Sequence, residues 1–566
     1  MSEDILTAPK ISVRSAPRFD PRTRKWLWCA VLIVSVVGLY YVRLNEVFGQ
    51  AGDDAWYLLL AKSLATGQGL QLLTSPVPGI LPSYPPAFPF LLSMLLRCLR
   101  AENFWLLKLI SSAAMLGVGV ATFAYTARVR QLPLPMAAAL ALTVVLMPAF
   151  VFLATSTVMS ECVFTLAQLL TVIAAEKVLR RKKPATFWYW WVGVALLASW
   201  AFLTRSIAVS LLIAVVVYLL KERSYKAAVI FTASALLFIA PWILYARVNA
   251  TSSELKRIHG GNIVYTYGDQ LWMKRAGAST SGTATAWDLP ARIGQNAYNI
   301  AARDFCGMLF PSLLRSPQES GEETFALGES ETLGGGSMKG VPATAVVSLV
   351  LCCLALLGFL VVAARQVTLA EILLPCSFVV ILIWPWRTFR FVLPLAPFLL
   401  HYILVALATL ALGVRKVWRQ ANIIDEWAVP RMFMFCVLAL YAYDHIGYVR
   451  GQMQNTEASG WMSEYKESTE TLEWVRTHLP SEAIVAASNP ARVFLHSGHK
   501  ALSSEQPLEN WEMWKRLGVR YVVILESHGS TVLDGPEGAY PVLYRSVNDM
   551  RVIDLGPANS RLAPQS

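Results

Sequence analysis

The chain has 566 residues, of which 55% are hydrophobic and only 15% are charged. Its mean hydropathy of +0.48 is too high for a series of ordinary globular domains, so the composition excludes a soluble multidomain protein and predicts a multispanning membrane protein. The formal net charge is +12, but no basic stretch is interleaved with aromatic residues, so nucleic acid is not expected as a partner.

The amino-terminal residues 1–25 form a basic tail, expected in the cytoplasm, ahead of the first apolar stretch. No small-residue cleavage site follows that stretch, which predicts an uncleaved first span. A helix needs roughly 20 mainly apolar residues to cross the hydrocarbon layer, and the sequence offers about eleven such stretches. They lie near residues 26–43, 104–127, 136–155, 157–176, 186–204, 206–220, 227–246, 341–364, 369–386, 391–412 and 428–448.

Every second loop between these stretches is basic. Lys and Arg gather around residues 128–130, 177–183, 221–226, 365 and 415–419. Because basic loops face the cytoplasm, the pattern predicts a polytopic α-helical domain over residues 26–448, in the inner (plasma) membrane. The same alternation places three large pieces on the extracytoplasmic side: residues 44–103, 247–340 and 449–566.

Two of these outer pieces have a distinctive composition. Residues 319–340 are acidic and glycine-rich without apolar periodicity, which predicts a plain solvated linker or a mobile lid. In the last piece, helical patterns at residues 470–479 and 509–518 alternate with strand patterns at 483–488, 520–527 and 551–555. We therefore expect residues 449–566 to form a small extracytoplasmic α/β domain.

Two adjacent carboxylates, Asp53 and Asp54, begin the stretch DDAWYLLLAKSLATGQGL in the first outer piece. One interpretation is structural, because Asp near the start of a helix accepts hydrogen bonds from free N–H groups and favours the helix dipole. The other is functional: one carboxylate acts as a general base toward an acceptor hydroxyl while the second remains a cap. A carboxylate at the interface meets both a lipid-borne and a soluble substrate, which favours a function.

Arginines at the predicted outer ends of spans suit phosphate, since the guanidinium donates two parallel hydrogen bonds and stays charged. The candidates are Arg205, Arg387 and Arg390, with interface anchoring as the alternative role for each. Glu161 lies in an apolar segment where a charge is costly, so we expect it to face a cation or substrate, or Arg205 as a structural partner. Tyr57 and Lys62 are secondary candidates, because interfacial positions suit such side chains without any function.

Several segments occur in an order typical of one class of membrane enzymes. They are DDAWYLLLAKSLATGQGL from Asp53, SYPPAFPFLLSMLL from Ser83, STVMSECVF from Ser156, AFLTRSIAV from Ala201 and RFVLPLAPF from Arg390. Together with the span order and the long first loop, they resemble bacterial membrane glycosyltransferases of the GT-C superfamily. The similar branches are the protein O-mannosyltransferase-like, aminoarabinose-transferase-like and Rgt-like proteins, and the resemblance covers nearly the whole chain.

The resemblance implies an inverting transfer of a sugar from a polyprenyl-phosphate carrier to an extracytoplasmic acceptor, within a GT-C fold. In such enzymes the first loop supplies the catalytic carboxylate, which matches Asp53 here. The chain departs at Ser83 and Tyr84, where the aminoarabinose-transferase branch has a Glu-Lys pair before its two prolines. The cationic phosphate contact and the donor of that branch are therefore not carried over to this chain. Tyr84 becomes a site candidate. The Rgt-like branch is the better comparison, but it does not identify the sugar.

Other functions have less support from the sequence. A non-catalytic lipid or sugar transporter is the alternative, but the chain shows no internal repeat and has its acidic pair in a loop. A ligand-binding sensor leaves the first-loop carboxylates without a role. No zinc, nicotinamide or P-loop signature is present, while a divalent cation (Mg²⁺ or Mn²⁺) that joins Asp53 or Asp54 to a phosphate stays open.

Overall fold

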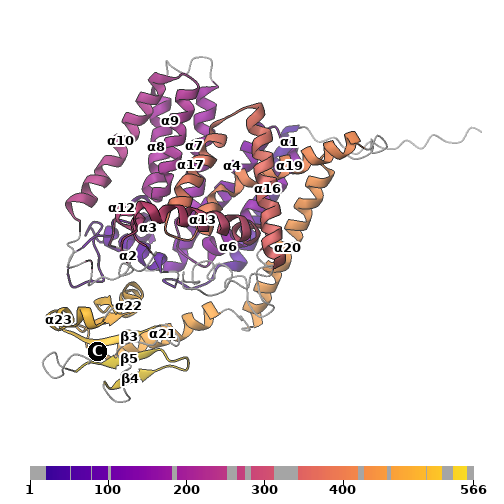
Figure 1. Ribbon diagram of the computed structural model, residues 1–566. Helices are drawn as coiled ribbons and strands as arrows, with labels where there is room; N and C mark the ends of the chain where they lie inside the picture. The colour runs from indigo at the N-terminus through magenta and orange to yellow at the C-terminus, as the bar shows by residue number, and fades with distance from the viewer. Residues whose placement is uncertain are drawn as a thin grey trace, which may run out of the picture.

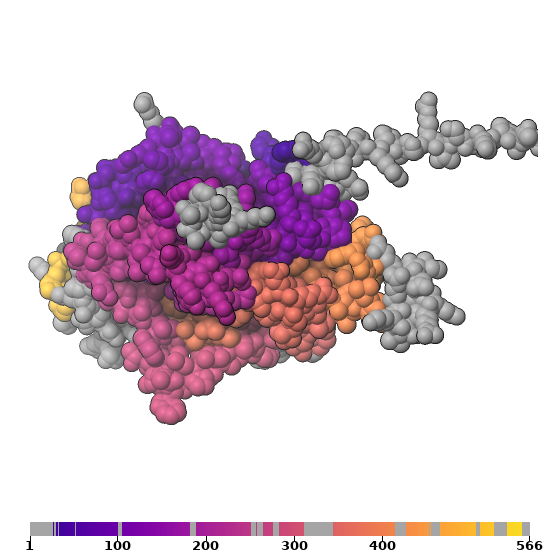
Figure 2. All heavy atoms as spheres, turned by 90° about the horizontal axis from the view of Figure 1, so that it is seen from above, coloured from indigo at the N-terminus to yellow at the C-terminus, as the bar shows by residue number. Residues whose placement is uncertain are grey.

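The computed structural model describes residues 21–50, 52–77, 79–99, 103–180, 188–250, 256, 264–274, 282–310, 342–417, 426–454, 460–504, 507–525 and 540–556. These residues form a bundle of apolar helices with a smaller domain, built on a β-sheet, at one end (Figure 1). Seen from above, earlier segments of the chain fill most of the view and the yellow carboxyl-terminal segment is visible only at the left edge (Figure 2). The sheet therefore lies at the far end of the bundle. The predicted linker or lid at 319–340 falls outside the described residues.

Within the described part of the chain, six helices are long and apolar enough to cross a membrane, and one bent pair makes a seventh if it is a single span. The six are α4 (Phe104–Arg128), α7 (Glu161–Leu179), α10 (Tyr225–Val248), α16 (Pro342–Arg365), α19 (Ala396–Val417) preceded by α18 (Phe389–Val392) and η7 (Leu393–Leu395), and α20 (Ala428–Gln454). The bent pair is α5 (Leu134–Val145) and α6 (Pro148–Thr155). Shorter apolar helices are the Ile33–Arg43 part of α1 (Pro21–Arg43), α3 (Ala87–Leu99), α8 (Trp188–Thr204), η2 (Ser206–Ala208) with α9 (Val209–Lys221), and α17 (Leu369–Ile383).

The chain is therefore a multi-pass membrane protein. Each apolar stretch predicted from the sequence corresponds to one of these helices or to the bent pair. The number of crossings and their direction stay predictions.

The predicted orientation has a direct test. We expect a reporter fused after Lys226, in a basic loop, to be cytoplasmic, and reporters fused after Gly69 and Gly498 to be extracytoplasmic. Paired alkaline phosphatase and green fluorescent protein fusions measure this, since each is active on one side only. A cytoplasmic signal after Gly498 would invert the topology and move Asp53 away from an outer acceptor.

Backbone geometry explains two features of the bundle. Helices α5 and α6 are bent by 52° at their junction, where Pro148 starts α6 and lacks the N–H that would continue α5. Residues 156–160 then run as a buried, irregular segment into α7. Helices α16 and α19 approach so closely that a Cβ at Gly358 would lie 1.8 Å from the Tyr402 carbonyl oxygen, so only glycine fits there.

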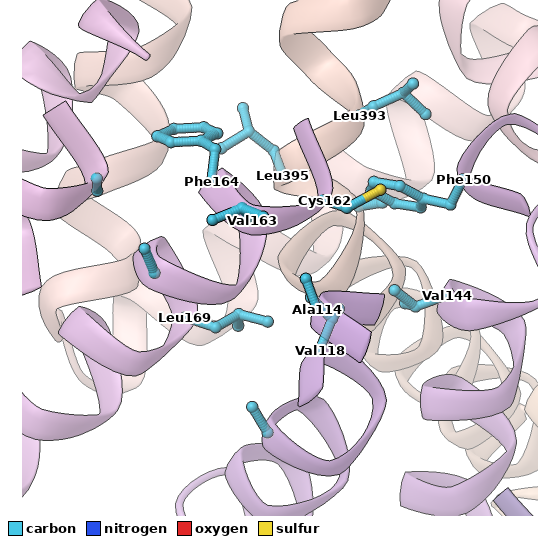
Figure 3. Packing of buried hydrophobic residues seen from close by; sticks show 14 of the residues in the cluster. Ala114, Val118, Val144, Phe150, Cys162, Val163, Phe164, Leu169, Leu393 and Leu395 are labelled. Atoms are coloured by element: carbon cyan, nitrogen blue, oxygen red, sulfur yellow. The ribbon is translucent and has the colours of Figure 1, made fainter. Parts of the chain in front are cut away.

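The core of the bundle is apolar and continuous. Figure 3 shows part of it, where side chains from α4, α5, α6, α7 and η7 pack together: Ala114, Val118, Val144, Phe150, Cys162, Val163, Phe164, Leu169, Leu393 and Leu395. This packing fixes the amino-terminal end of α7 against the residues that precede α19.

Short helices lie between the bundle and the sheet (Figure 1). They are α2 (Asp53–Ala65), α12 (Tyr267–Leu271), η4 (Ala286–Asp288), α13 (Leu289–Asn299), the π-helical turn η5 (Ile300–Asp304) and α14 (Phe305–Leu309). Helix α13 runs across the direction of the long helices (Figure 1). These helices surround the end of the bundle from which the candidate site residues come.

The carboxyl-terminal part contains a five-stranded sheet in the order β2-β1-β3-β5-β4. Its strands are β1 (Ile484–Ala487), β2 (Ala501–Ser503), β3 (Val519–Ile524), β4 (Val542–Arg545) and β5 (Arg551–Asp554), and its helices are α21 (Gly460–His478), α22 (Pro490–Ser497) and α23 (Pro507–Leu517). Strands β2, β1 and β3 are parallel, with Val485 opposite Ala501. Strand β5 pairs antiparallel with β3, where Val522 lies opposite Ile553, and antiparallel with β4 on its other side.

Alternate residues of the strands face opposite sides of the sheet, and helices cover both sides. Val522 packs with Trp514 of α23, while Val523 packs with Leu472 of α21 and Val493 of α22. The strand patterns predicted at 483–488, 520–527 and 551–555 coincide with β1, β3 and β5. Strands β2 and β4 were not predicted, because β2 has three residues and β4 is mostly exposed, so neither carries an alternating pattern.

Candidate active site

Helix α2 begins directly with the two first-loop carboxylates, which the structure separates. Asp54 is fully buried, and its carboxylate accepts hydrogen bonds from Gly49 N at 3.0 Å and from Ala55 N at 2.8 Å. Burial raises the pKa of Asp54 to about 6, although these N–H groups and the charge of Lys108 oppose the shift. Asp54 therefore has the contacts of a structural residue that fixes the turn before α2.

Asp53 faces a different environment from its neighbour. Its side chain is 37% exposed, and Oδ1 accepts a hydrogen bond from the Tyr84 hydroxyl at 2.6 Å. Oδ2 lies 3.0 Å from Nη2 of Arg390, which is 337 positions away in sequence. Tyr84 also packs edge-on against the ring of Tyr57. The structure thus brings three sequence-predicted candidates, Tyr84, Arg390 and Tyr57, together beside the accessible carboxylate of Asp53.

Glu161 connects both arginines to this carboxylate. It is the first residue of α7 and is fully buried. Its Oε1 lies 2.7 Å from Nη1 of Arg205 and 2.6 Å from Nη2 of Arg390. The Arg205 side chain is 11% exposed and that of Arg390 is 16% exposed, so water weakens these ion pairs less than it would at the surface. The expected contact between Glu161 and Arg205 is present, and a second arginine shares it.

Two further side chains belong to the cluster and were not predicted as site residues. The Ser160 hydroxyl lies 2.9 Å from the Tyr57 hydroxyl and accepts a hydrogen bond from Arg205 at 3.3 Å. Burial raises the pKa of Tyr267, the first residue of α12, and the charge of Arg205 opposes that shift. Ser160 precedes Glu161 in the segment STVMSECVF, so its position could have been used to predict it as a site residue. Tyr267 lies in a stretch without apolar periodicity, which gave no such indication.

The polar connections behind Asp54 were also not predicted. Lys108 of α4 is completely buried, and its Nζ donates to the Asn45 carbonyl at 2.8 Å and to Asn45 Oδ1 at 2.7 Å. The Asn45 amide in turn donates to the Ser156 hydroxyl at 3.0 Å. These bonds attach the chain ahead of α2 to the irregular segment ahead of α7, which is how Asp53 and Glu161 come to share one site.

The turn that leads to Arg390 is held from outside the bundle. Nδ2 of Asn296 in α13 donates to the carbonyls of Leu382 and Trp384, each at 2.9 Å. Thr388, the residue before α18, donates its hydroxyl hydrogen to Oδ2 of the buried Asp304 at 2.5 Å. Burial raises the pKa of Asp304 to about 7. The outer helices therefore fix the position from which Arg390 reaches Asp53.

We expect the Asp304→Asn variant to be more thermally stable than the wild type at pH 8, with a clearly smaller difference at pH 5. A raised pKa means that the folded state holds the proton more tightly than the unfolded state, so the wild type loses this stabilisation progressively as the pH rises from the unfolded value of 3.8 through the folded value of about 7. The shift corresponds to roughly 4 kcal/mol at most. Asparagine remains neutral and still accepts the hydrogen bond from Thr388.

Melting temperatures in detergent between pH 5 and pH 8 measure this difference. The control is Asp288→Asn, because hydrogen bonds from Thr285 lower the pKa of the exposed Asp288. Its stability difference from wild type should have the opposite sign at pH 8. Equal melting temperatures for wild type and Asp304→Asn across the range would contradict the assignment.

The two other sequence-predicted candidates, Lys62 and Arg387, lie near the cluster in the chain. Lys62 lies nine residues beyond Asp53 in α2, which is roughly 13 Å along the helix axis. Arg387 is half-buried in the turn between α17 and α18 and precedes Arg390 by three residues. The functional roles of both stay predictions.

The carboxylates do not converge as metal ligands. Asp53 is directed to Tyr84 and Arg390, and Asp54 to backbone N–H groups. Within the described ranges, no three His, Cys, Asp or Glu side chains come together in a way that suits a metal ion. The negative charge of Asp53 is balanced by a guanidinium group.

The fold and this cluster define a class: a multi-pass helical membrane protein with ion-paired carboxylates and arginines at the end of the bundle that meets the sheet domain. No protein-family model and no curated protein sequence matches the chain. Solved structures do match. ArnT from Cupriavidus metallidurans, bound to undecaprenyl phosphate, is similar with a TM-score of 0.53 and 13% identity, over 94% of this chain and 99% of that one.

Two archaeal structures are similar as well. The oligosaccharyltransferase of Archaeoglobus fulgidus in the apo form has a TM-score of 0.54 and 13% identity, over 91% of this chain and 70% of its own. AglB from the same organism, in complex with an inhibitory peptide and a dolichol-phosphate, has a TM-score of 0.53 and 14% identity, over 88% and 69%. At these identities the similarity shows the fold. The resemblance to GT-C membrane glycosyltransferases is thereby confirmed at the level of the fold.

Proposed function

We propose that the protein is an inverting glycosyltransferase that moves a sugar from a polyprenyl-phosphate donor to an acceptor on the extracytoplasmic side of the inner (plasma) membrane. The observation that supports this most directly is the chain of contacts from Asp53 through Arg390 and Glu161 to Arg205. It occurs in a fold shared with a protein bound to undecaprenyl phosphate and one in complex with a dolichol-phosphate. The acceptor is a cell-envelope glycan, lipid or protein.

The paired arginines suit the phosphate of such a donor. Both guanidinium groups contact the same oxygen of Glu161, so one buried negative charge holds two positive charges close together. A phosphate that binds both groups takes the place of Asp53 at Arg390 and accepts charge-assisted hydrogen bonds, each contributing roughly 1.5–3 kcal/mol. Arg205 and Arg390 therefore take the leaving phosphate in this proposal, with Arg387 as a further candidate.

Asp53 suits the role of general base. Its side chain is more exposed than those of Arg390 and Glu161, so an acceptor hydroxyl reaches it from solvent. The hydroxyl oxygen attacks the anomeric carbon opposite the phosphate, and its proton passes to Asp53. The new bond joins the acceptor oxygen to the anomeric carbon, and the bond to the phosphate oxygen breaks. Polyprenyl phosphate leaves with that electron pair, stabilised by the arginines.

Donor binding also prepares the base. In the structure, Asp53 Oδ2 is 3.0 Å from Arg390 Nη2. A donor phosphate competes with Asp53 for this guanidinium, because both are anions that need the same N–H donors. Once the phosphate is bound, the Asp53 carboxylate is released from Arg390 and can accept the proton of the acceptor hydroxyl. This order makes the base most effective only when a donor is present.

The proposal is tested with purified protein, a polyprenyl-phosphate sugar pool and an envelope extract as acceptor. We expect labelled sugar to pass to the acceptor fraction while free polyprenyl phosphate accumulates in equal amount. The same protein in liposomes tests the alternative function. Movement of intact donor across the bilayer with no sugar transfer would favour a transporter and contradict the enzyme.

A further inference from the structure

The carboxyl-terminal domain packs against the first outer loop just ahead of α2, where Phe48 lies. The ring of Phe48 stacks on His496 of α22, with centroids 4.4 Å apart and planes 5° from parallel. Tyr465 of α21 packs against Phe48 at 6.4 Å, and its hydroxyl donates to the Glu46 carbonyl at 3.3 Å. His496 and Tyr465 also pack edge-on against each other, so Phe48 belongs to a cluster with two aromatic rings of the carboxyl-terminal domain.

The contacts of Phe48 with His496 and Tyr465 lie next to the backbone that orients α2. Gly49, the residue after Phe48, adopts a φ of 75° and donates its N–H to Asp54 Oδ2 at 3.0 Å. Arg492 of α22 is 3% exposed, packs beside Gly49, and lies over the ring of Tyr465 with Cζ 5.2 Å from the ring centroid. A displaced Phe48 therefore moves the hydrogen bond that fixes the first turn of α2, where Asp53 and Asp54 lie.

The same domain also holds the chain beyond α2. The Leu73 carbonyl accepts a hydrogen bond from Lys500 Nζ at 2.6 Å. The next carbonyl, that of Thr74, accepts one from Ala501 N, at the start of β2, at 2.8 Å. Both ends of the segment that contains α2 are thus attached to a domain more than 400 positions away in sequence.

We infer that the carboxyl-terminal domain positions the proposed base, and that His496 is a positioning residue that acts through Phe48 and Gly49 on the first turn of α2. This inference rests on the proposed function. The arginines that take the phosphate are held by Glu161 of α7, although Arg390 also contacts Asp53. Loss of the contacts to Phe48 therefore lowers turnover without weakening donor binding.

The test compares His496→Ala with His496→Phe in the full-length protein. Burial and the charge of Arg492 lower the pKa of His496 to about 4, against a hydrogen bond to the Phe48 backbone that raises it, so the ring is uncharged. Phenylalanine keeps the stack but loses this hydrogen bond. We expect His496→Ala to lower kcat about 10-fold or more, because small displacements of a catalytic group cost rate steeply. KM for the donor should not rise, and His496→Phe should recover most of kcat.

A matched control exists in the same domain. His478 stacks on Trp474 with centroids 4.6 Å apart and planes 5° from parallel, within α21. His478→Ala removes an equivalent stack, and we expect it to retain wild-type kcat. Phe48→Ala should lower kcat as His496→Ala does, and the double variant should be no slower than either, because both remove one contact.

A measurement independent of sugar transfer separates this inference from the proposed function. Amide hydrogen exchange of residues 44–60 should be faster in His496→Ala than in wild type and His478→Ala, because Gly49 N–H loses its fixed partner. If hydrogen exchange of residues 44–60 in His496→Ala equalled that of the wild type, the inference would be overturned. The same holds if the wild type transferred sugar and His496→Ala had an unchanged kcat. Neither result would touch the proposed function. An inactive wild type with faster exchange in the variant would instead overturn the proposed function and leave the positioning contact supported.

Discussion

Asp53→Asn is expected to lower sugar transfer about 100-fold or more, because asparagine keeps the size of the side chain but cannot take the acceptor proton. Binding of the donor should persist and become tighter. In the wild type, Arg390 Nη2 is 3.0 Å from Asp53 Oδ2, and the variant removes the negative charge that competes with phosphate for it. The measurements are single-turnover transfer from a purified donor and binding of polyprenyl phosphate in detergent.

Asp54→Asn is the matched control, since it makes the same chemical change one residue later. Asp54 is completely buried and bonds to backbone N–H groups, so the change should act on stability more than on the chemical step. We expect a smaller loss of turnover at equal folded concentration. Wild-type turnover in Asp53→Asn, or an equal loss in both variants, would remove the distinction between base and structural residue.

The membrane architecture could be predicted because hydropathy and loop charge are properties of continuous segments. The helix starting at Asp53, the apolar character of α7 and the strands β1, β3 and β5 follow from local patterns of this kind. The resemblance in motif order reached further, because it connected segments that are distant in sequence. Asp53, Glu161, Arg205 and Arg390 lie in four separate motifs and meet at one site.

The contacts that give these residues their geometry could not be predicted in the same way. The hydroxyl of Thr388 reaches Asp304 across 84 positions, and Lys108 reaches Asn45 across 63, without a repeating pattern in either segment. Likewise, nothing local to Phe48 indicates a stack on His496. Such contacts depend on how whole elements pack, so they appear only when the fold is known.

Removing Arg390 is expected to weaken donor binding about 10-fold to 100-fold, the loss of one charge-assisted contact. Arg390→Ala leaves Glu161 paired with Arg205 alone and leaves Asp53 without its cation. Arg390→Lys keeps the charge but has no planar fork, so it cannot reproduce contacts through both Nε and Nη2 and should recover only part of the affinity. Arg387→Ala changes an arginine in the same turn. It tests whether Arg205 and Arg390 alone bind the phosphate or whether Arg387 also takes part.

The decisive comparison combines both changes, because the competition between Asp53 and the donor phosphate operates through Arg390. Asp53→Asn should tighten binding of polyprenyl phosphate when Arg390 is present and should have little effect on binding in the Arg390→Ala background. The coupling free energy between Asp53 and Arg390 then equals the difference between the tightening caused by Asp53→Asn with Arg390 present and that caused by Asp53→Asn in the Arg390→Ala background. If Asp53→Asn tightened binding equally with and without Arg390, its charge would act on the phosphate directly, and the proposed exchange of partners on donor binding would be wrong.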